Sequence, residues 1–134
     1  MLRMSYMPSD FHPIVLMIGQ AEGVRSLADA LDAFAGDGDP LALRDGRGIV
    51  SEDTEVTLRV PDNGRIGMFP PAAGRDLDWW LTRDDAAAFA DEVRALADGG
   101  APSGSVALDC DVLGEVVVKV SIGEWEEGFL DPGA

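Results

Sequence analysis

The sequence predicts an α+β fold, a two-layer sandwich in which two helices pack on one face of a mainly antiparallel sheet. Three observations lead to this prediction. Two segments of the 134-residue chain carry apolar residues at helical spacing. The segment between them alternates apolar and polar residues and is interrupted by turn sequences, as antiparallel strands are. Each helical stripe has to be covered, and one sheet placed beneath both helices covers the two stripes together.

The length of the chain fits one domain with one hydrophobic core. Residues 1–10 are expected to form a flexible lead-in, because Pro8 and Ser9 mark its end. Residues 11–134 are expected to form a single α+β domain. It begins with a near-continuous apolar run from Phe11 to Ile18, which predicts a strand buried on both faces.

The next segment places Val24, Leu27, Leu31 and Phe34 on one helical face, and Gly36 is expected to end that helix. Short apolar runs and turn sequences follow up to residue 75. They predict two successive hairpins that together form a meander, followed by a loop rich in proline and alanine. The predicted hairpin strands are residues 41–44 with 49–50, and 56–60 with 66–68 across the Pro61–Gly64 turn.

The stretch from Trp79 to Trp125 predicts a helix that leads into a β-hairpin. Thr82 is in position to cap the helix, which Gly99 is expected to end. Residues 106–110 and 116–122 alternate apolar and polar side chains, as two paired strands do. At least one of the two tryptophans that precede the cap is expected to seal the helix against the sheet, because an indole buries a large apolar area.

The formal net charge of −15 comes from 25 acidic and 10 basic residues. So negative a surface repels nucleic acid and anionic membranes and favours a basic protein as partner. A second explanation stays open, since a compositional bias also raises acidic content, and Lys119 is the only lysine. Cys110 has no second cysteine to pair with, and the N-terminus has no signal-peptide run, so a cytoplasmic location is expected.

The sequence contains no motif of a known catalytic or cofactor-binding type. His12 is the only histidine, and with a single cysteine it cannot supply a zinc site of ordinary composition. The glycines are not spaced as in nucleotide-binding loops. We therefore assign no catalytic residue, cofactor or metal ligand, and the sequence favours a binding protein over an enzyme.

The first functional hypothesis is a small acidic protein-binding module, an inhibitor or immunity-type protein that docks a basic partner. Its motivation is the acidic and aromatic C-terminal segment, in which an aromatic side chain surrounded by carboxylates would anchor the partner. The predicted partner-binding residues are Glu124, Trp125, Glu126, Glu127 and Phe129.

Two alternatives remain. One is a small-ligand-binding protein or enzyme with a pocket near the 70–83 loop, where arginines would hold an anion and tryptophans would line an apolar wall. The other is a structural subunit that forms a homodimer by pairing an exposed edge strand, residues 116–122. The residues of the alternative ligand site are Arg75, Trp79, Trp80 and Arg83.

Overall fold

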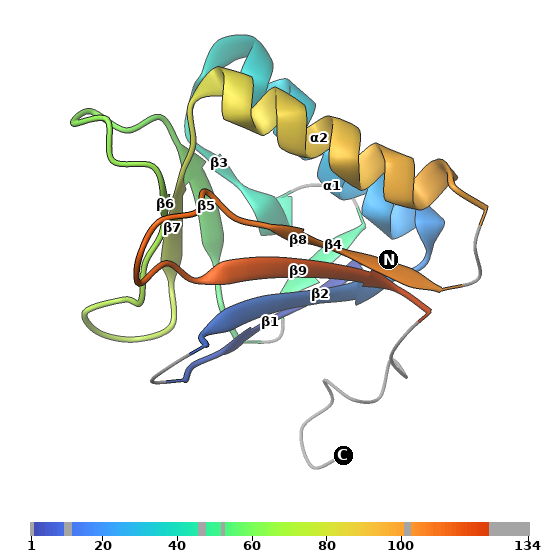
Figure 1. The fold of residues 1–134 in the computed structure, drawn as a ribbon, viewed down its shortest axis with the longest axis horizontal. Helices are drawn as coiled ribbons and strands as arrows, with labels where there is room; N and C mark the ends of the chain where they lie inside the picture. The colour runs from blue at the N-terminus through green and yellow to red at the C-terminus, as the bar shows by residue number, and fades with distance from the viewer. Residues whose placement is uncertain (1, 10–11, 46–47, 52, 101–102, 124–134) are drawn as a thin grey trace.

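The computed structural model describes residues 2–9, 12–45, 48–51, 53–100 and 103–123. Within them the chain forms an α+β fold in which two helices lie side by side on one face of a sheet (Figure 1). The elements are β1 (Leu2–Met7), β2 (Ile14–Gly19), α1 (Ala21–Asp37), β3 (Leu41–Ala42), the 3₁₀ turn η1 (Leu43–Asp45), β4 (Ile49–Ser51), β5 (Val56–Arg59), β6 (Gly67–Met68), β7 (Leu77–Trp80), α2 (Arg83–Asp98), β8 (Gly104–Leu108) and β9 (Val117–Ile122).

The strands form two sheets instead of one. The first sheet has the order β4-β1-β2-β9-β8, and the second has the order β3-β5-β7-β6. Strands that are neighbours in the chain pair antiparallel, as in β1–β2, β6–β7 and β8–β9. Strands far apart in the chain supply the parallel pairs β1–β4 and β2–β9. The predicted α+β class is confirmed, and the predicted mainly antiparallel sheet is replaced by two mixed sheets.

The N-terminal residues belong to the core, so the predicted flexible lead-in is wrong for residues 2–7. They form β1, which pairs with β2 from Leu2 opposite Gly19 to Met7 opposite Ile14. Leu2, Met4 and Tyr6 are buried, and the residues between them are less apolar. This period-two alternation is typical of a strand, and β1 lies inside the sheet between β4 and β2.

The two hairpins predicted in the middle of the chain are also wrong. β3 pairs with β5 of the second sheet, whereas β4 pairs with β1 of the first sheet. β7 lies between β5 and β6, so these two strands do not pair with each other. The physical reason for the second change is the burial of Trp79. β7 carries this indole into the core, and in the sheet register the Trp79 backbone lies opposite Leu58 of β5 and Met68 of β6.

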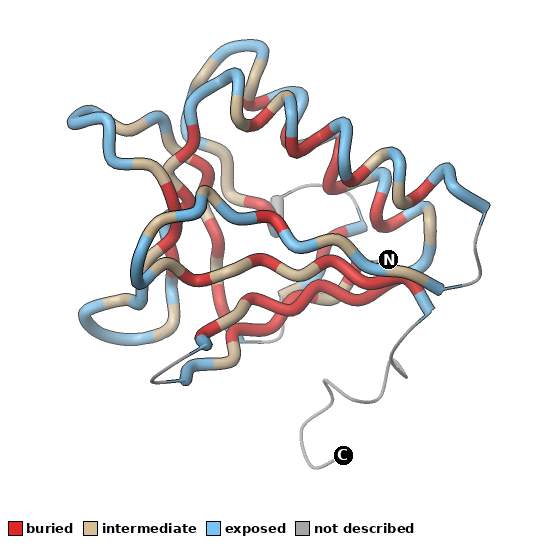
Figure 2. The backbone as a smooth tube through the Cα atoms, viewed as in Figure 1, coloured by how far each residue is buried: buried red, intermediate tan, exposed pale blue. Residues whose placement is uncertain are grey.

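The core lies between the helices and the two sheets (Figure 2). The predicted stripe of α1 is buried, but the predicted end at Gly36 is wrong: the helix continues to Asp37. Gly38, with φ of 72°, ends it by donating its N–H to the Phe34 carbonyl at 2.7 Å. In α2 the predicted Thr82 cap is confirmed, since its side chain accepts from the Asp85 N–H at 3.0 Å. The hairpin of β8 and β9 is confirmed as well.

β9 is not an edge strand, so the homodimer predicted from pairing at residues 116–122 has no free edge there. β2 pairs with β9 on one side and β8 pairs with it on the other. β2 is buried on both faces, as predicted, with Val15 and Met17 facing the core and Leu16 and Ile18 buried on the opposite face. Neither described helix is both long and apolar enough to cross a membrane.

Candidate functional site

Two loop regions meet at one end of the molecule, which we call the loop end: residues 60–76 of the second sheet and the 109–116 turn of the first. Val116 donates its N–H to the Met68 carbonyl at 2.6 Å, which holds the turn against β6. In Figure 1 these loops lie at the left, beside the labels of β6 and β7. The loop end therefore joins the two sheets and is built from segments that are far apart in the chain.

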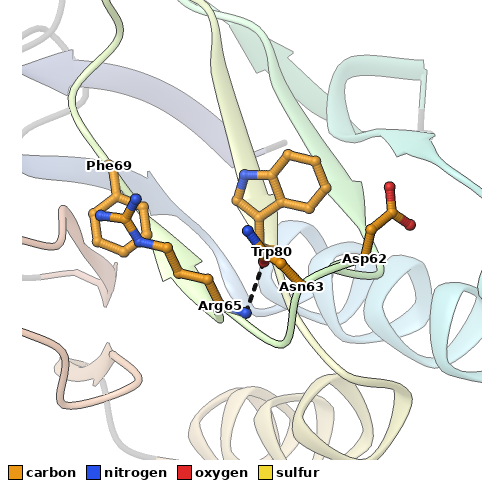
Figure 3. Close-up of a pocket in the computed structure, with 5 residues that line it drawn as sticks. All are labelled: Asp62, Asn63, Arg65, Phe69 and Trp80. Carbon is orange, nitrogen blue, oxygen red and sulfur yellow. Dashed lines mark hydrogen bonds between the residues drawn. The ribbon is translucent and has the colours of Figure 1, made fainter.

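A cleft of about 220 Å³ opens at the loop end around Trp80 (Figure 3). Successive residues of a strand point to opposite faces, so Trp79 of β7 is buried in the core and Trp80 is half-buried at the surface. The indole of Trp80 lies between Asp62 on one side and the Arg65 and Phe69 side chains on the other. The described lining residues are Asp62, Asn63, Arg65, Phe69 and Trp80.

The turn before β6 places Arg65 over Phe69. Gly64 has φ of 76°, and the Asn63 side chain accepts the Arg65 N–H at 2.9 Å, which closes the turn. The guanidinium carbon of Arg65 lies 4.0 Å from the centroid of the Phe69 ring. This distance is that of a cation–π contact, so one wall of the cleft already carries a stacked guanidinium.

Two further hollows lie at the loop end. One of about 420 Å³ follows the proline-rich loop beneath Trp80, and one of about 450 Å³ lies along the 109–117 turn. Both are open to solvent. Gly67, with φ of 116°, separates the Phe69 ring from the Glu115 carboxylate, and a Cβ there would lie 3.3 Å and 3.2 Å from them. Only glycine keeps the two walls this close.

Glu115 organises the 109–116 turn. Its carboxylate accepts the N–H groups of Cys110 at 2.9 Å and of Val112 at 3.0 Å. Burial, and after it the negative charges of Glu115, Asp85 and Asp109, together raise the pKa of the Cys110 thiol to about 12. The thiol is therefore a poor nucleophile at neutral pH.

We expect iodoacetamide to alkylate Cys110 in the folded protein at pH 8.5 at least ~10-fold more slowly than in the same chain unfolded in urea. The folded pKa lies above the ordinary value of 9.0, so the stability that the protonated thiol contributes is retained below pH 9 and falls as the pH rises towards 12. Equal alkylation rates in the two states would contradict this assignment. A Cys110→Ala chain, whose unfolding lacks this alkaline component, is the control for the pH dependence.

The residues predicted for the alternative ligand site lie in different surroundings. Trp80 lines the cleft, whereas Trp79 is 1% exposed and stacks on Phe89. Arg75 pairs with Asp53 at 2.8 Å and donates to the Tyr6 carbonyl. Arg75, Trp79 and Arg83 are not among the described residues that line the cleft or the neighbouring hollow of about 420 Å³.

Arg83 holds the two helices together instead of facing the cleft. Its Nε donates to the Ala35 carbonyl at 2.7 Å, and its Nη2 donates to the Gly36 carbonyl. These carbonyls belong to the last turn of α1, where the helix leaves its acceptors without internal partners. A cation at this position also complements the negative end of the helix dipole. Arg83 is thus a cap supplied by one helix to the other.

The predicted partner-binding residues lie outside the described residues, so they remain a prediction. They are Glu124, Trp125, Glu126, Glu127 and Phe129. The sequence predicts the Asn63-Gly64 turn but not the cleft residues Asp62, Arg65 and Phe69 around it. In the sequence these residues only flank a turn. They lie near Trp80 because β6, which follows the turn, pairs with β7.

Within the described residues, no group of three or more histidine, cysteine, aspartate or glutamate side chains is arranged to hold a metal ion. His12 is exposed, and its backbone N–H donates to the Ser9 hydroxyl at 3.3 Å. Comparison with protein-family models, curated proteins and solved structures found no match. The site is therefore interpreted from its own geometry and charge.

Proposed function

We propose that the chain is a small acidic protein-binding module that docks a basic partner through its loop end, in the manner of an inhibitor or immunity-type protein. The observation that carries the proposal is the distribution of charge. The chain has a net charge of −15, and its arginines are largely engaged within the molecule. What faces solvent is therefore strongly negative, and it attracts a basic protein over long range.

Ion pairs neutralise the arginines locally. Arg94 of α2 contacts two aspartates of α1, at 3.1 Å and 2.7 Å, and these neighbours raise the pKa of its guanidinium. The remaining acidic side chains exceed the basic ones and lie mostly at the surface. Exposed ion pairs include Arg25 with Asp98, Arg44 with Glu55, Arg59 with Asp78, Arg75 with Asp53, and Arg94 with Asp29 and Asp32.

The loop end combines this negative charge with apolar contact area. Trp80 and Phe69 are partly exposed in the cleft, and Leu113 at the tip of the neighbouring turn is 98% exposed. Exposed carboxylates surround these side chains. Protein interfaces typically place a few large apolar anchors inside a polar rim, and the loop end has this composition. The exposed acids around it are Asp62, Asp76, Asp78, Asp109 and Asp111.

The geometry favours a protein partner over a small metabolite. Pockets for drug-sized ligands occupy roughly 300–1,000 Å³, and the cleft around Trp80 is smaller, at about 220 Å³. The two larger hollows have volumes within that range, but they are open to solvent and would leave much of a small ligand exposed. Arg75 and Arg83, which an anionic ligand would need, are engaged with other parts of the chain. A surface of this kind suits side chains projected by a partner protein.

The test is a pull-down from the source lysate at 50 mM and 300 mM salt with three forms of the protein. The wild type is expected to retain one or a few basic proteins at low salt and to lose them at higher salt, because screening weakens exposed charges. A loop-end variant, Asp62→Asn with Asp76→Asn and Asp109→Asn, is expected to retain at least ~10-fold less. The matched control removes three charges from α2, by Asp84→Asn, Asp91→Asn and Glu92→Gln.

Each retained protein is then purified and titrated against the three forms by calorimetry, so that capture alone is not the criterion. Failure to retain any basic protein at either salt concentration would overturn the proposal. Equal binding by the loop-end variant and the α2 control would show that the charge acts without a specific face, which would overturn the assignment to the loop end.

A further inference from the structure

We infer that the Trp80 cleft receives one arginine side chain of the basic partner, and that Arg65 limits the affinity of the cleft by occupying the face of Phe69. This inference rests on the proposed function and specifies the group that the partner inserts. It draws on the volume of the cleft, on the rings that line it, and on the charges around it.

The volume and the lining select a single cationic side chain. A cleft of about 220 Å³ that is walled by an indole and a phenyl ring offers aromatic faces, which attract cations through their quadrupole. Figure 3 shows the Trp80 indole in the middle of the cleft, with the Asp62 carboxylate beside it. An inserted guanidinium would therefore stack on the indole and face a carboxylate at its edge.

The charges around the cleft disfavour an anion. Of the nearby aspartates, Asp78 is paired with Arg59 at 2.9 Å. Asp62 and Asp76 are exposed. Asp62 lines the cleft, and Asp76 lines the neighbouring hollow of about 420 Å³, which shares Trp80 with the cleft. Arg65 offsets one of these charges, so the immediate surroundings stay negative, as does the whole molecule.

Arginine fits this cleft better than lysine does. The guanidinium is planar, sheds water readily, stacks on aromatic rings and donates two parallel hydrogen bonds to a carboxylate. An ammonium group is more strongly hydrated and cannot stack in this way. The protein already shows the preferred contact, because Arg65 stacks on Phe69 at 4.0 Å.

That internal contact has a cost for the partner. Arg65 covers one aromatic face and places a positive charge next to the position of the incoming guanidinium, and like charges repel. Removal of the Arg65 side chain frees the ring and removes the repulsion. The variant Arg65→Ala is therefore expected to bind an arginine ligand more tightly than the wild type does.

The experiment measures fluorescence anisotropy of labelled hexa-arginine and hexa-lysine peptides at 50 mM salt. The wild type is expected to bind hexa-arginine more tightly than hexa-lysine. Trp80→Ala is expected to weaken hexa-arginine binding about 5- to 30-fold, since a partly desolvated cation–π contact is lost, and to change hexa-lysine binding less. Arg65→Ala is expected to strengthen hexa-arginine binding about 3-fold. Thermal unfolding checks that each variant is folded, and Trp80→Phe, which keeps a ring, is expected to retain part of the affinity.

The matched pair of variants Asp62→Asn and Asp91→Asn distinguishes the contribution of the cleft from that of the overall negative charge. Each variant removes one carboxylate, the first at the cleft and the second on the exposed face of α2. Only Asp62→Asn is expected to weaken the preference for arginine. If both act alike, if Trp80→Ala binds as the wild type does, or if Arg65→Ala weakens binding, the inference is overturned. The proposed function survives those outcomes and fails separately, when no basic protein is retained from the lysate.

Discussion

Replacing Trp79 by alanine is expected to lower the free energy of unfolding by about 3–5 kcal/mol, the usual cost of truncating a fully buried aromatic side chain. The indole is 1% exposed and stacks on Phe89 of α2, with ring centroids 5.8 Å apart and planes at 29°. It lies on β7, the strand that joins β5 to β6, so its loss leaves a cavity between α2 and the second sheet. Urea denaturation followed by circular dichroism measures the change.

Trp80→Ala is the internal control, because the same side chain is removed one residue away. Trp80 is half-buried and lines an open cleft, so its removal leaves no closed cavity and is expected to cost about 1 kcal/mol or less. Equal losses for the two variants would show that Trp80 is also a core residue, which would contradict both its assignment to the cleft and its use as a binding anchor.

The two tryptophans show which features of the structure can be predicted from the sequence. The expectation that at least one of them seals the helix against the sheet is met by Trp79. Which of the two is buried depends on the face of the sheet to which each side chain points. Those directions are known only once both residues are placed in strand β7. The run from Leu77 to Trp80 has only four residues, too few for a pattern that predicts a strand, so the sequence alone does not give the orientation of either tryptophan.

The sequence predicted elements that depend on local patterns, although the β1–β2 and β6–β7 pairs, whose strands are also neighbours in the chain, were not among them. The two helices, the Thr82 cap and the β8–β9 hairpin depend on periodicity and turns within about 20 residues. The parallel pairs β1–β4, β2–β9 and β5–β7 depend on contacts over longer distances. No turn signal reports such pairing, so the division into two sheets was not foreseen.

The same distinction applies to the candidate site. Arginine next to aromatic residues suggested an anion site at Arg75 and Arg83, because residue type and sequence proximity were the only information. The structure gives each arginine a distant partner, Asp53 and the end of α1 respectively. Arg65 and Phe69 meet Trp80 only because β6 pairs with β7. Pairing between strands, which local patterns do not encode, determines the composition of the cleft.

Asp53 connects the two sheets, and we expect Asp53→Ala to lower the free energy of unfolding by about 2 kcal/mol. Its carboxylate accepts the Tyr6 N–H at 3.1 Å, the Ser5 hydroxyl at 3.2 Å and the Arg75 Nη2 at 2.8 Å. Tyr6 and Ser5 belong to β1 of the first sheet, and Arg75 precedes β7 of the second. Hydrogen bonds to a charged group contribute about 1.5–3 kcal/mol each in favourable cases, and the partial exposure of this pair reduces that value through solvent screening.

A double-mutant cycle with Arg75→Ala distinguishes this connection from an ordinary surface ion pair. The guanidinium also donates to the Tyr6 carbonyl and lies 5.2 Å from the Tyr6 ring, so it is held on several sides. We expect a coupling energy of about 1 kcal/mol between Asp53 and Arg75, because each loses one charge-assisted hydrogen bond when the other is absent. The matched control is the half-exposed pair of Arg25 with Asp98, for which the coupling is expected to be about 0.5 kcal/mol or less. Additive effects at Asp53 and Arg75 would mean that their ion pair contributes no more than an ordinary surface pair, and the assignment of this pair as a connection between the two sheets would be wrong.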